Sequence, residues 1–201
     1  MSRILLVRHG NTKSNSAERF WGRTDVELSA HGLKQAEQLR DRLSSEKIDT
    51  IYTSNLRRAS ITAGIIASHH QAEIITCPAL QEINFGKVEG LTYAEISQRY
   101  PELVDTWLAR DLSFRFPGGE SVGEFNKRVT EFLGTLAKHT PDESILIVAH
   151  SGVLRLLICH LLGIEPWYWR QFRVDLASLS MLETYPQGAI LNSLNDVSHL
   201  K

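Results

Sequence analysis

The chain has 201 residues with 22 basic and 23 acidic side chains, so its net charge is close to zero. This balance excludes a general electrostatic attraction to nucleic acid or to an anionic membrane, and any basic site must be local. Two cysteines without CxxC spacing predict neither a zinc site nor a disulfide framework. We expect one domain over 1–201 and, because no stretch resembles a signal peptide or a membrane span, a cytoplasmic protein.

The first predicted strand contains the apolar run Ile4–Val7, which is typical of a strand buried on both faces of a parallel sheet. Arg8 and His9 follow where this run ends, and open α/β sheets bind ligands just beyond the carboxyl ends of their strands. Gly10 permits a sharp exit from the sheet, so that both side chains can face one crevice.

A polar loop over 11–28 comes next and carries Trp21, Gly22 and Arg23 beside the expected site. These residues are candidates for a substrate pocket, and packing of Trp21 against the body of the protein is an equal alternative. Ser29 then caps a predicted helix. The apolar stripe of this helix consists of Leu33, Ala36, Leu39 and Leu43.

A short strand over 49–54 leads to a helix that begins near Asn55, with Arg57 and Arg58 in its first turn. A basic residue there opposes the helix dipole, a cost that makes sense if one of the two arginines holds an anion. Neighbouring residues of a helix point in different directions, so the other arginine is expected on the solvated surface.

A third strand over 72–77 precedes a loop in which Glu82 lies among Leu80, Ile83 and Phe85. Apolar neighbours favour the protonated form of a carboxyl group, which suits a general acid. From the residues alone, an exposed loop glutamate is the more favoured interpretation.

Residues from about 89 to 120 are predicted to form an insertion with two short helices, one capped by Thr92 and one over 102–110. We interpret this insertion as a cap over the crevice that selects substrates. A capping box at Ser121 and Glu124 then starts a long helix.

A strand over 144–149 follows, then a helix over 152–162, a strand over 178–184 and a weaker edge strand over 189–194. This alternation predicts the α/β class, as a three-layer α/β/α sandwich with a mostly parallel sheet and a short helical cap insertion.

The strand over 144–149 repeats the design of the first, because His150, Ser151 and Gly152 follow its apolar run. If the two strands are neighbours, His9 and His150 meet above the sheet. A single histidine at a strand end is more often structural. Two in matching context, one of them preceded by arginine, predict an anion site.

Arginine matches the geometry of phosphoryl oxygens, and a neutral imidazole is a competent nucleophile toward phosphorus. The set of His9, His150, Arg8 and one of the arginines over 57–58 therefore predicts phosphoryl chemistry, with Glu82 as candidate acid. We expect no metal or other cofactor, because the sequence has no carboxylate cluster, no H-x-x-x-H and no Walker loop.

The segment Arg8–Thr12, with Asn15 three residues on, resembles the R-H-G motif of the histidine phosphatase (phosphoglycerate-mutase-like) superfamily. The segments 52–59, 80–90 and 148–152 resemble three further motifs of that family in the same order, so the resemblance covers nearly the whole chain. It implies His9 as the phosphorylated nucleophile, Glu82 as the proton donor and His150 as the second catalytic histidine. The phosphate-binding residues that it implies are Arg8, Asn15, Arg58 rather than Arg57, Ser151 and Gly152.

The short cap and the segment 116–121 are most similar to those of phosphatases, notably the α-ribazole phosphatases of cobalamin synthesis. The resemblance therefore implies a metal-independent phosphomonoesterase for a small phosphorylated metabolite. One candidate is α-ribazole 5'-phosphate, which would suit a pocket with Trp21, Trp107 or Phe114.

Three alternatives stay open, namely a phosphoglycerate mutase, a broad-specificity sugar phosphatase and a non-catalytic module that binds phosphorylated ligands. The aromatic cluster Trp167–Trp169 fits a homodimer patch, a pocket wall or ordinary packing, and packing is favoured.

Overall fold

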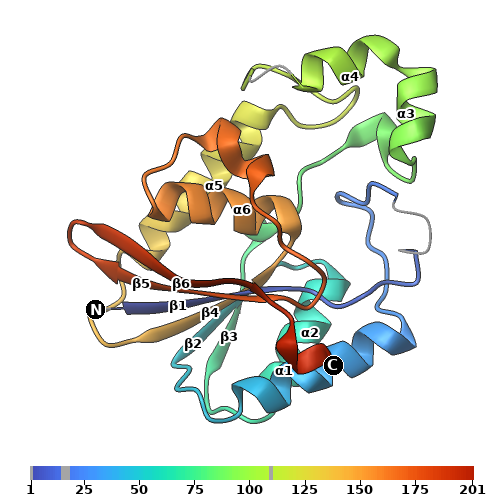
Figure 1. Ribbon diagram of the computed structural model, residues 1–201. Helices are drawn as coiled ribbons and strands as arrows, with labels where there is room; N and C mark the ends of the chain where they lie inside the picture. Colours follow the sequence, from blue (N-terminus) through green and yellow to red (C-terminus); the bar gives the residue numbers. More distant parts are fainter. Residues whose placement is uncertain (1, 15–18, 109–110) are drawn as a thin grey trace.

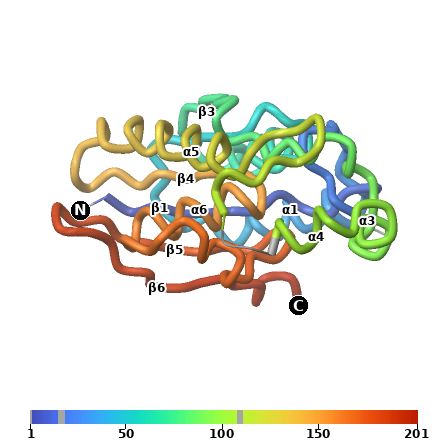
Figure 2. Tube along the Cα trace, turned by 90° about the horizontal axis from the view of Figure 1, so that it is seen from above, coloured from blue at the N-terminus to red at the C-terminus, as the bar shows by residue number. Residues whose placement is uncertain are grey.

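The computed structural model describes residues 2–14, 19–108 and 111–201, which surround a six-stranded sheet of order β3-β2-β4-β1-β5-β6 (Figures 1 and 2). Four neighbouring strands are parallel: β3 (Glu73–Thr76), β2 (Thr50–Thr53), β4 (Ser144–Ala149) and β1 (Ser2–Arg8). Strand β5 (Leu179–Tyr185) is antiparallel to β1, and β6 (Gly188–Asp196) is antiparallel to β5 at the sheet edge. The predicted mostly parallel sheet and its last edge strand are confirmed.

Helices cover both faces of the sheet, α1 (Ala30–Leu43) and α2 (Arg57–Ala67) on one side and α5 (Val122–Leu136) and α6 (Ser151–Leu161) on the other (Figure 1). Because side chains alternate along a strand, the run Ile4–Val7 serves both cores. Its first and third residues pack with α5 and α6, and its second and fourth with α1 and α2. The expected three-layer α/β/α sandwich is confirmed.

The predicted stripe of α1 is wrong at one position. Leu33 is 41% exposed, whereas Ala36, Leu39 and Leu43 are buried without any exposed surface. The buried face of this helix begins at Gly32, and each further residue turns by about 100° around the axis. Leu33 therefore lies beyond the edge of the buried face.

The insertion carries α3 (Tyr93–Arg99) and α4 (Pro101–Leu108), which lie away from the sheet, beyond α5 and α6 (Figure 1). A capping box between Thr92 and Glu95 starts α3 as predicted. Short 3₁₀ helices occur at η2 (Pro78–Leu80), η3 (Gly86–Val88), η4 (Pro166–Gln171) and η5 (Ser198–Leu200). In the described part of the chain, no helix is long and apolar enough to cross a membrane.

Candidate active site

The two histidines lie next to each other at the carboxyl edge of the parallel strands. Strands β1 and β4 are paired with Arg8 opposite Ala149. His9 and His150 are the next residues after this pair, so they lie side by side where the two strands end. Their ring centroids are 5.1 Å apart. The predicted meeting of the two histidines is therefore found in the structure, and it follows from the pairing of two strands of the same design.

Gly10 is needed for a reason other than the one expected. Its backbone does not adopt the left-handed conformation that favours glycine. Instead, a Cβ atom at this position would lie 2.5 Å from the carbonyl oxygen of Gly32 in α1. Glycine thus permits the first turn of α1 to approach the chain that leaves His9.

The ring of His9 is oriented by a hydrogen bond in its own turn. Nδ1 lies 2.8 Å from the carbonyl oxygen of Gly10, and because a carbonyl only accepts, Nδ1 carries the proton and donates it. The lone pair of the neutral ring is then on Nε2. Burial, followed by the positive charges of Arg58 and Arg8, holds the pKa of His9 well below its usual value, so the ring is uncharged at neutral pH.

His150 is held between Arg58 and Ser54. The Nε of Arg58 donates to Nδ1 of His150 over 3.3 Å, and Nε2 of His150 lies 2.9 Å from Oγ of Ser54. Since Nδ1 accepts, Nε2 carries the ring proton and donates it to the hydroxyl. Burial, then the charge of Arg58, also lowers the pKa of His150 well below its usual value.

Arg58 is 1% exposed, and two backbone carbonyl groups hold its guanidinium in place. Its Nη1 donates to the carbonyl oxygen of Thr24 at 2.8 Å and its Nη2 to that of Gly22 at 2.6 Å, which leaves one N–H on each nitrogen for a ligand. Its neighbour Arg57 lies on the surface, where it forms an ion pair of 2.6 Å with Glu27. The structure thus separates the two arginines as the helix geometry requires.

Arg8 places a second guanidinium beside His9. Its Nη1 donates to the carbonyl oxygen of Val174 at 2.7 Å, whereas its Nε is buried without a hydrogen-bond partner among the described residues. Burial lowers the pKa of Arg8 to about 10, so the group keeps its charge at neutral pH. A partly buried cation with unused donors is suited to bind an anion.

Glu82 is 7% exposed, so the interpretation as an exposed loop glutamate is wrong. Its Oε1 accepts the N–H of Ile83 and its Oε2 the N–H of Gly152, each at 3.0 Å. The predicted phosphate ligand Gly152 therefore binds the Glu82 carboxyl group here. The structure brings this carboxyl group to the first turn of α6, next to His150.

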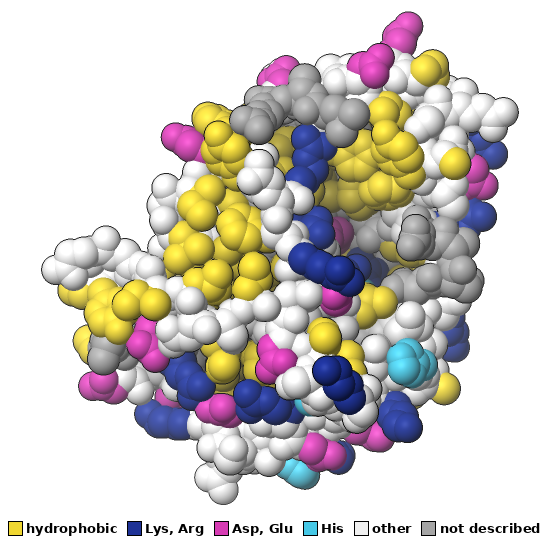
Figure 3. Space-filling view, in the orientation of Figure 1, with side chains coloured by type: hydrophobic (Ala, Val, Ile, Leu, Met, Phe, Trp, Pro, Cys, Tyr) yellow, Lys and Arg dark blue, Asp and Glu magenta, His cyan; other side chains and the backbone are white. Residues whose placement is uncertain are grey.

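A cavity of about 810 Å³ opens at this site and is lined by Arg8, His9, Arg58 and Glu82, whereas His150 is not among its lining residues. In Figure 3, basic side chains line a hollow between hydrophobic patches. Of the predicted pocket residues, Trp21 and Trp107 line this cavity, and so do Ser151 and Gly152.

The other predicted pocket residues lie elsewhere. Gly22 is behind Arg58, and Arg23 points to Glu120, so neither is among the residues that line the cavity. Phe114 is buried against Phe116. In the aromatic cluster, Trp169 combines two of the expected roles, because it packs on Phe125 and also lines the cavity.

Sequence reasoning missed Arg155, which lines the cavity from α6. Its Nε is buried without a hydrogen-bond partner among the described residues. The sequence signal that could have identified Arg155 is its spacing of four residues from Ser151, because residues at this spacing lie on the same face of a helix. Ser54, the partner of His150, was missed as well.

Two further predictions concern the phosphate ligand Asn15 and the absence of a metal site. Asn15, a predicted phosphate ligand, is outside the described residues. Within residues 2–14, 19–108 and 111–201, no group of three or more His, Cys, Asp or Glu side chains is arranged to hold a metal ion.

Comparisons with known proteins identify the family of this chain. The model of the histidine phosphatase superfamily (branch 1) matches residues 4–197. Phosphoserine phosphatase 1 of Hydrogenobacter thermophilus is 33% identical over 200 residues, covering 100% of this chain and 95% of the relative. The adenosylcobalamin/alpha-ribazole phosphatase of Escherichia coli is 32% identical, covering 96% and 95%.

Among solved structures, the alpha-ribazole phosphatase from Shigella flexneri superposes with a TM-score of 0.87 at 33% identity, covering 96% of each chain. These relatives are phosphatases by name, which supports a phosphoric monoester hydrolase here. With a family match over almost its entire length and the paired histidines in place, the chain belongs to branch 1 of the histidine phosphatase superfamily.

Proposed function

We propose that this chain is a metal-independent phosphomonoesterase that acts on a small phosphorylated metabolite through a phosphohistidine at His9. The observation that carries the proposal is the neutral imidazole of His9, protonated on Nδ1 and flanked by His150 and the guanidinium groups of Arg8 and Arg58. This arrangement offers a nucleophilic nitrogen inside a cluster of positive charge, which is what attack on a phosphoryl group requires.

In the first proposed step, the Nε2 lone pair of His9 attacks phosphorus, and the bond from phosphorus to the ester oxygen breaks. The carboxyl group of Glu82 gives its proton to the leaving oxygen, which departs as an alcohol. Arg8 and Arg58 stabilise the charge on the phosphoryl oxygens during the transfer, and His150 accepts a hydrogen bond from Arg58 that helps to hold this guanidinium in place.

In the second step, the Glu82 carboxylate takes a proton from water while the water oxygen attacks phosphorus. The bond between phosphorus and His9 breaks, inorganic phosphate leaves, and both residues return to their starting protonation states. Water is the only co-substrate, and no step needs an oxidant.

The cavity is large enough for a substrate much bigger than its phosphate, since pockets of about 300–1,000 Å³ hold drug-sized ligands. α-Ribazole 5'-phosphate is the first candidate, supported by the aromatic walls of Trp21, Trp107 and Trp169 and by the alpha-ribazole phosphatase relatives. Phosphoserine is the second candidate, because Arg155 offers an unused donor to a second acidic group and a relative is a phosphoserine phosphatase.

The test is phosphate release with chelator present, measured on α-ribazole 5'-phosphate, phosphoserine, sugar mono- and bisphosphates, 3-phosphoglycerate and p-nitrophenyl phosphate. We expect one alkyl phosphate to be turned over far faster than the others, and comparable rates on all would instead indicate a broad-specificity phosphatase. His9→Ala should abolish turnover and leave a folded protein by circular dichroism.

The same assay separates the remaining alternatives. Transfer of phosphate between the hydroxyl groups of phosphoglycerate, with little release, would indicate a mutase. Binding without turnover of any compound would indicate a non-catalytic module. Unchanged activity of His9→Ala would refute the phosphohistidine mechanism itself.

A further inference from the structure

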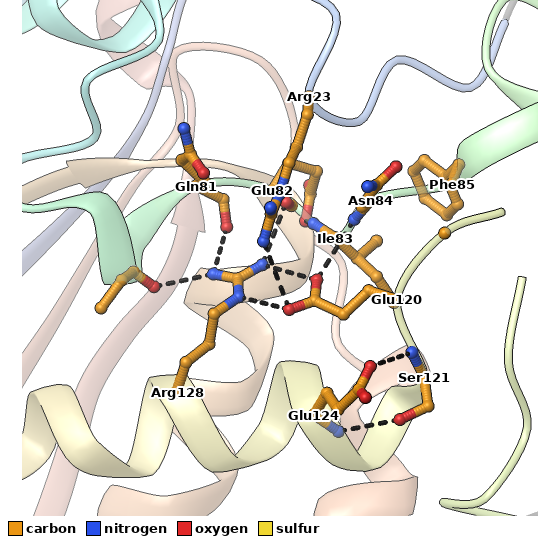
Figure 4. Close-up of polar contacts among 12 residues, drawn as sticks. Arg23, Gln81, Glu82, Ile83, Asn84, Phe85, Glu120, Ser121, Glu124 and Arg128 are labelled. Carbon is orange, nitrogen blue, oxygen red and sulfur yellow. Dashed lines mark hydrogen bonds and ion pairs between the residues drawn. The ribbon is translucent and has the colours of Figure 1, made fainter.

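Arg128 of α5 lies against the loop that carries Glu82, and each N–H of its guanidinium has an acceptor (Figure 4). Nη1 donates to the carbonyl oxygens of Ala79 and Gln81 at 2.8 and 2.6 Å, and Nη2 donates to that of Glu82 at 3.0 Å. The other two N–H groups bind Glu120 with paired bonds, Nε to Oε1 at 2.7 Å and Nη2 to Oε2 at 3.0 Å. Since arginine has five N–H donors, all of them are used.

Glu120 connects Arg128 to two loops of the site, one that carries Glu82 and one that carries Arg23. Its Oε2 accepts the N–H of Asn84 at 3.2 Å, and its own N–H donates to the carbonyl oxygen of Asn84 at 2.9 Å. Its Oε1 lies 3.4 Å from Nη2 of Arg23, which follows the residue whose carbonyl holds Arg58. Glu120 thus joins the loop of the acid to the loop behind the phosphate-binding arginine.

The pair of Arg128 and Glu120 is largely buried and lies outside the cavity. The side chains of Arg128 and Glu120 are 15% and 9% exposed, and neither is among the residues that line the cavity. A buried ion pair adds little net stability over well-packed apolar side chains, because desolvation of the charges offsets their attraction. The presence of this ion pair is therefore better explained by the residues that it positions than by a gain in stability.

The loop over 81–84 has no regular secondary structure, so its carbonyl groups need partners from elsewhere. Arg128 supplies them on one side of the backbone. On the other side, the Glu82 carboxyl group is held by the N–H groups of Ile83 and Gly152. Glu82 is consequently fixed at its main chain and at its carboxyl end, as proton transfer to a defined atom requires.

We infer that Arg128 and Glu120 are positioning residues that fix the Glu82 loop for proton transfer to and from the substrate. This inference rests on the proposed role of Glu82 as acid and base. The two residues act without touching the substrate, through five hydrogen bonds from one guanidinium and the backbone contacts of one carboxylate.

A positioning role differs from a structural one in how it depends on the leaving group. An alkoxide needs a proton to leave, whereas p-nitrophenolate leaves without one, and kcat/KM reports the steps up to the departure of the leaving group. Misplacement of Glu82 should therefore slow alkyl phosphates selectively. Partial unfolding would lower kcat/KM for both substrate types by the same factor.

The experiment compares Arg128→Ala with Glu82→Gln, using p-nitrophenyl phosphate and the alkyl phosphate that the wild type turns over fastest. We expect Arg128→Ala to lower kcat/KM for the alkyl phosphate by about 100-fold, the lower range for loss of a general acid, with at most a roughly fivefold loss for p-nitrophenyl phosphate. The double variant should be no slower than Glu82→Gln. Lys127→Ala, which changes the exposed neighbour on α5, is the matched control and should behave as wild type.

Two milder variants extend the test if Arg128→Ala does not fold. Arg128→Lys keeps the charge but has three donors, and Glu120→Gln keeps the shape but loses the charge, so both should show the same selectivity with a smaller loss. Equal losses on both substrates, or a double variant that loses the product of the single effects, would overturn the inference. If Glu82→Gln itself shows no selectivity, the proposed role of Glu82 fails first and the inference fails with it.

Discussion

Replacing Gly152 by alanine tests whether the Glu82 carboxyl group must lie where the structure places it. A Cβ atom at Gly152 would lie 2.4 Å from Oε1 of Glu82 and 3.1 Å from the Phe125 ring, and ordinary contacts begin at 3.4 Å. The carboxyl group must therefore move by about 1 Å, because it is the movable end of a side chain and the helix backbone is not.

The expected loss follows from this displacement. A misplacement of about 1 Å in a reacting group can cost roughly 100-fold in rate, so kcat/KM for an alkyl phosphate should fall by about that factor. The free energy of unfolding should fall by at most about 2 kcal/mol. Alanine in a helix is favoured over glycine by about 1 kcal/mol, which offsets part of the roughly 1–3 kcal/mol cost of overpacking.

The assay is kcat/KM on the fastest alkyl phosphate beside urea unfolding of the same preparation. Gly134→Ala in α5 is the matched control, since a Cβ atom there has no neighbour within 4 Å, and it should keep full activity. If Gly152→Ala retains wild-type kcat/KM while it remains folded, then the position of the Glu82 carboxyl group does not limit the reaction, and the argument is refuted.

Three further predictions concern stability and substrate choice. His9 and His150 together should lower the free energy of unfolding by about 2–3 kcal/mol between pH 7.5 and 5.5, because unfolded histidines take up protons below about pH 6.5 while the lowered pKa values of these two keep them neutral in the fold. Burial also lowers the pKa values of His70, His160 and His199, which add to the drop in the same direction. Urea unfolding at both pH values checks this, and His9→Asn should reduce the drop by about 1–1.5 kcal/mol. Arg155→Met should raise KM for phosphoserine by at least roughly tenfold in steady-state assays, as expected for a lost charged hydrogen bond. KM for p-nitrophenyl phosphate should stay unchanged, and equal shifts of KM for both substrates would count against a second anion contact. Leu39→Ala should destabilise by about 2–5 kcal/mol in thermal unfolding because Leu39 is fully buried, whereas Leu33→Ala, at a position that is 41% exposed, should cost less than about 1 kcal/mol.

Features that depend on short-range pattern could be predicted from the sequence. The apolar runs before His9 and His150 predicted buried parallel strands, and their common ending predicted that the two histidines meet. The spacing of Arg57 and Arg58 predicted that only one faces the site. These results follow from local geometry that the backbone alone imposes.

Features that depend on contacts between distant segments could not be predicted in this way. The burial of Glu82 results from contacts with α5 and α6, which no local pattern encodes. From the sequence, Arg128 resembles an ordinary surface arginine of an amphipathic helix. In the structure it binds three carbonyl groups that lie 46 to 49 residues earlier in the chain. Arg155 was overlooked because its neighbours in sequence are apolar and its role depends on an open cavity.

The proposed reacting groups lie on different kinds of structure, and this has a consequence for heating. His9 and His150 directly follow the two central strands, whose backbone hydrogen bonds are expected to open only when the whole domain unfolds. Glu82 lies on an irregular loop that can open at a lower free energy. Warming should therefore weaken hydrolysis of alkyl esters before it affects the proposed attack by His9, so that the enzyme loses its activity on poor leaving groups before it loses its fold.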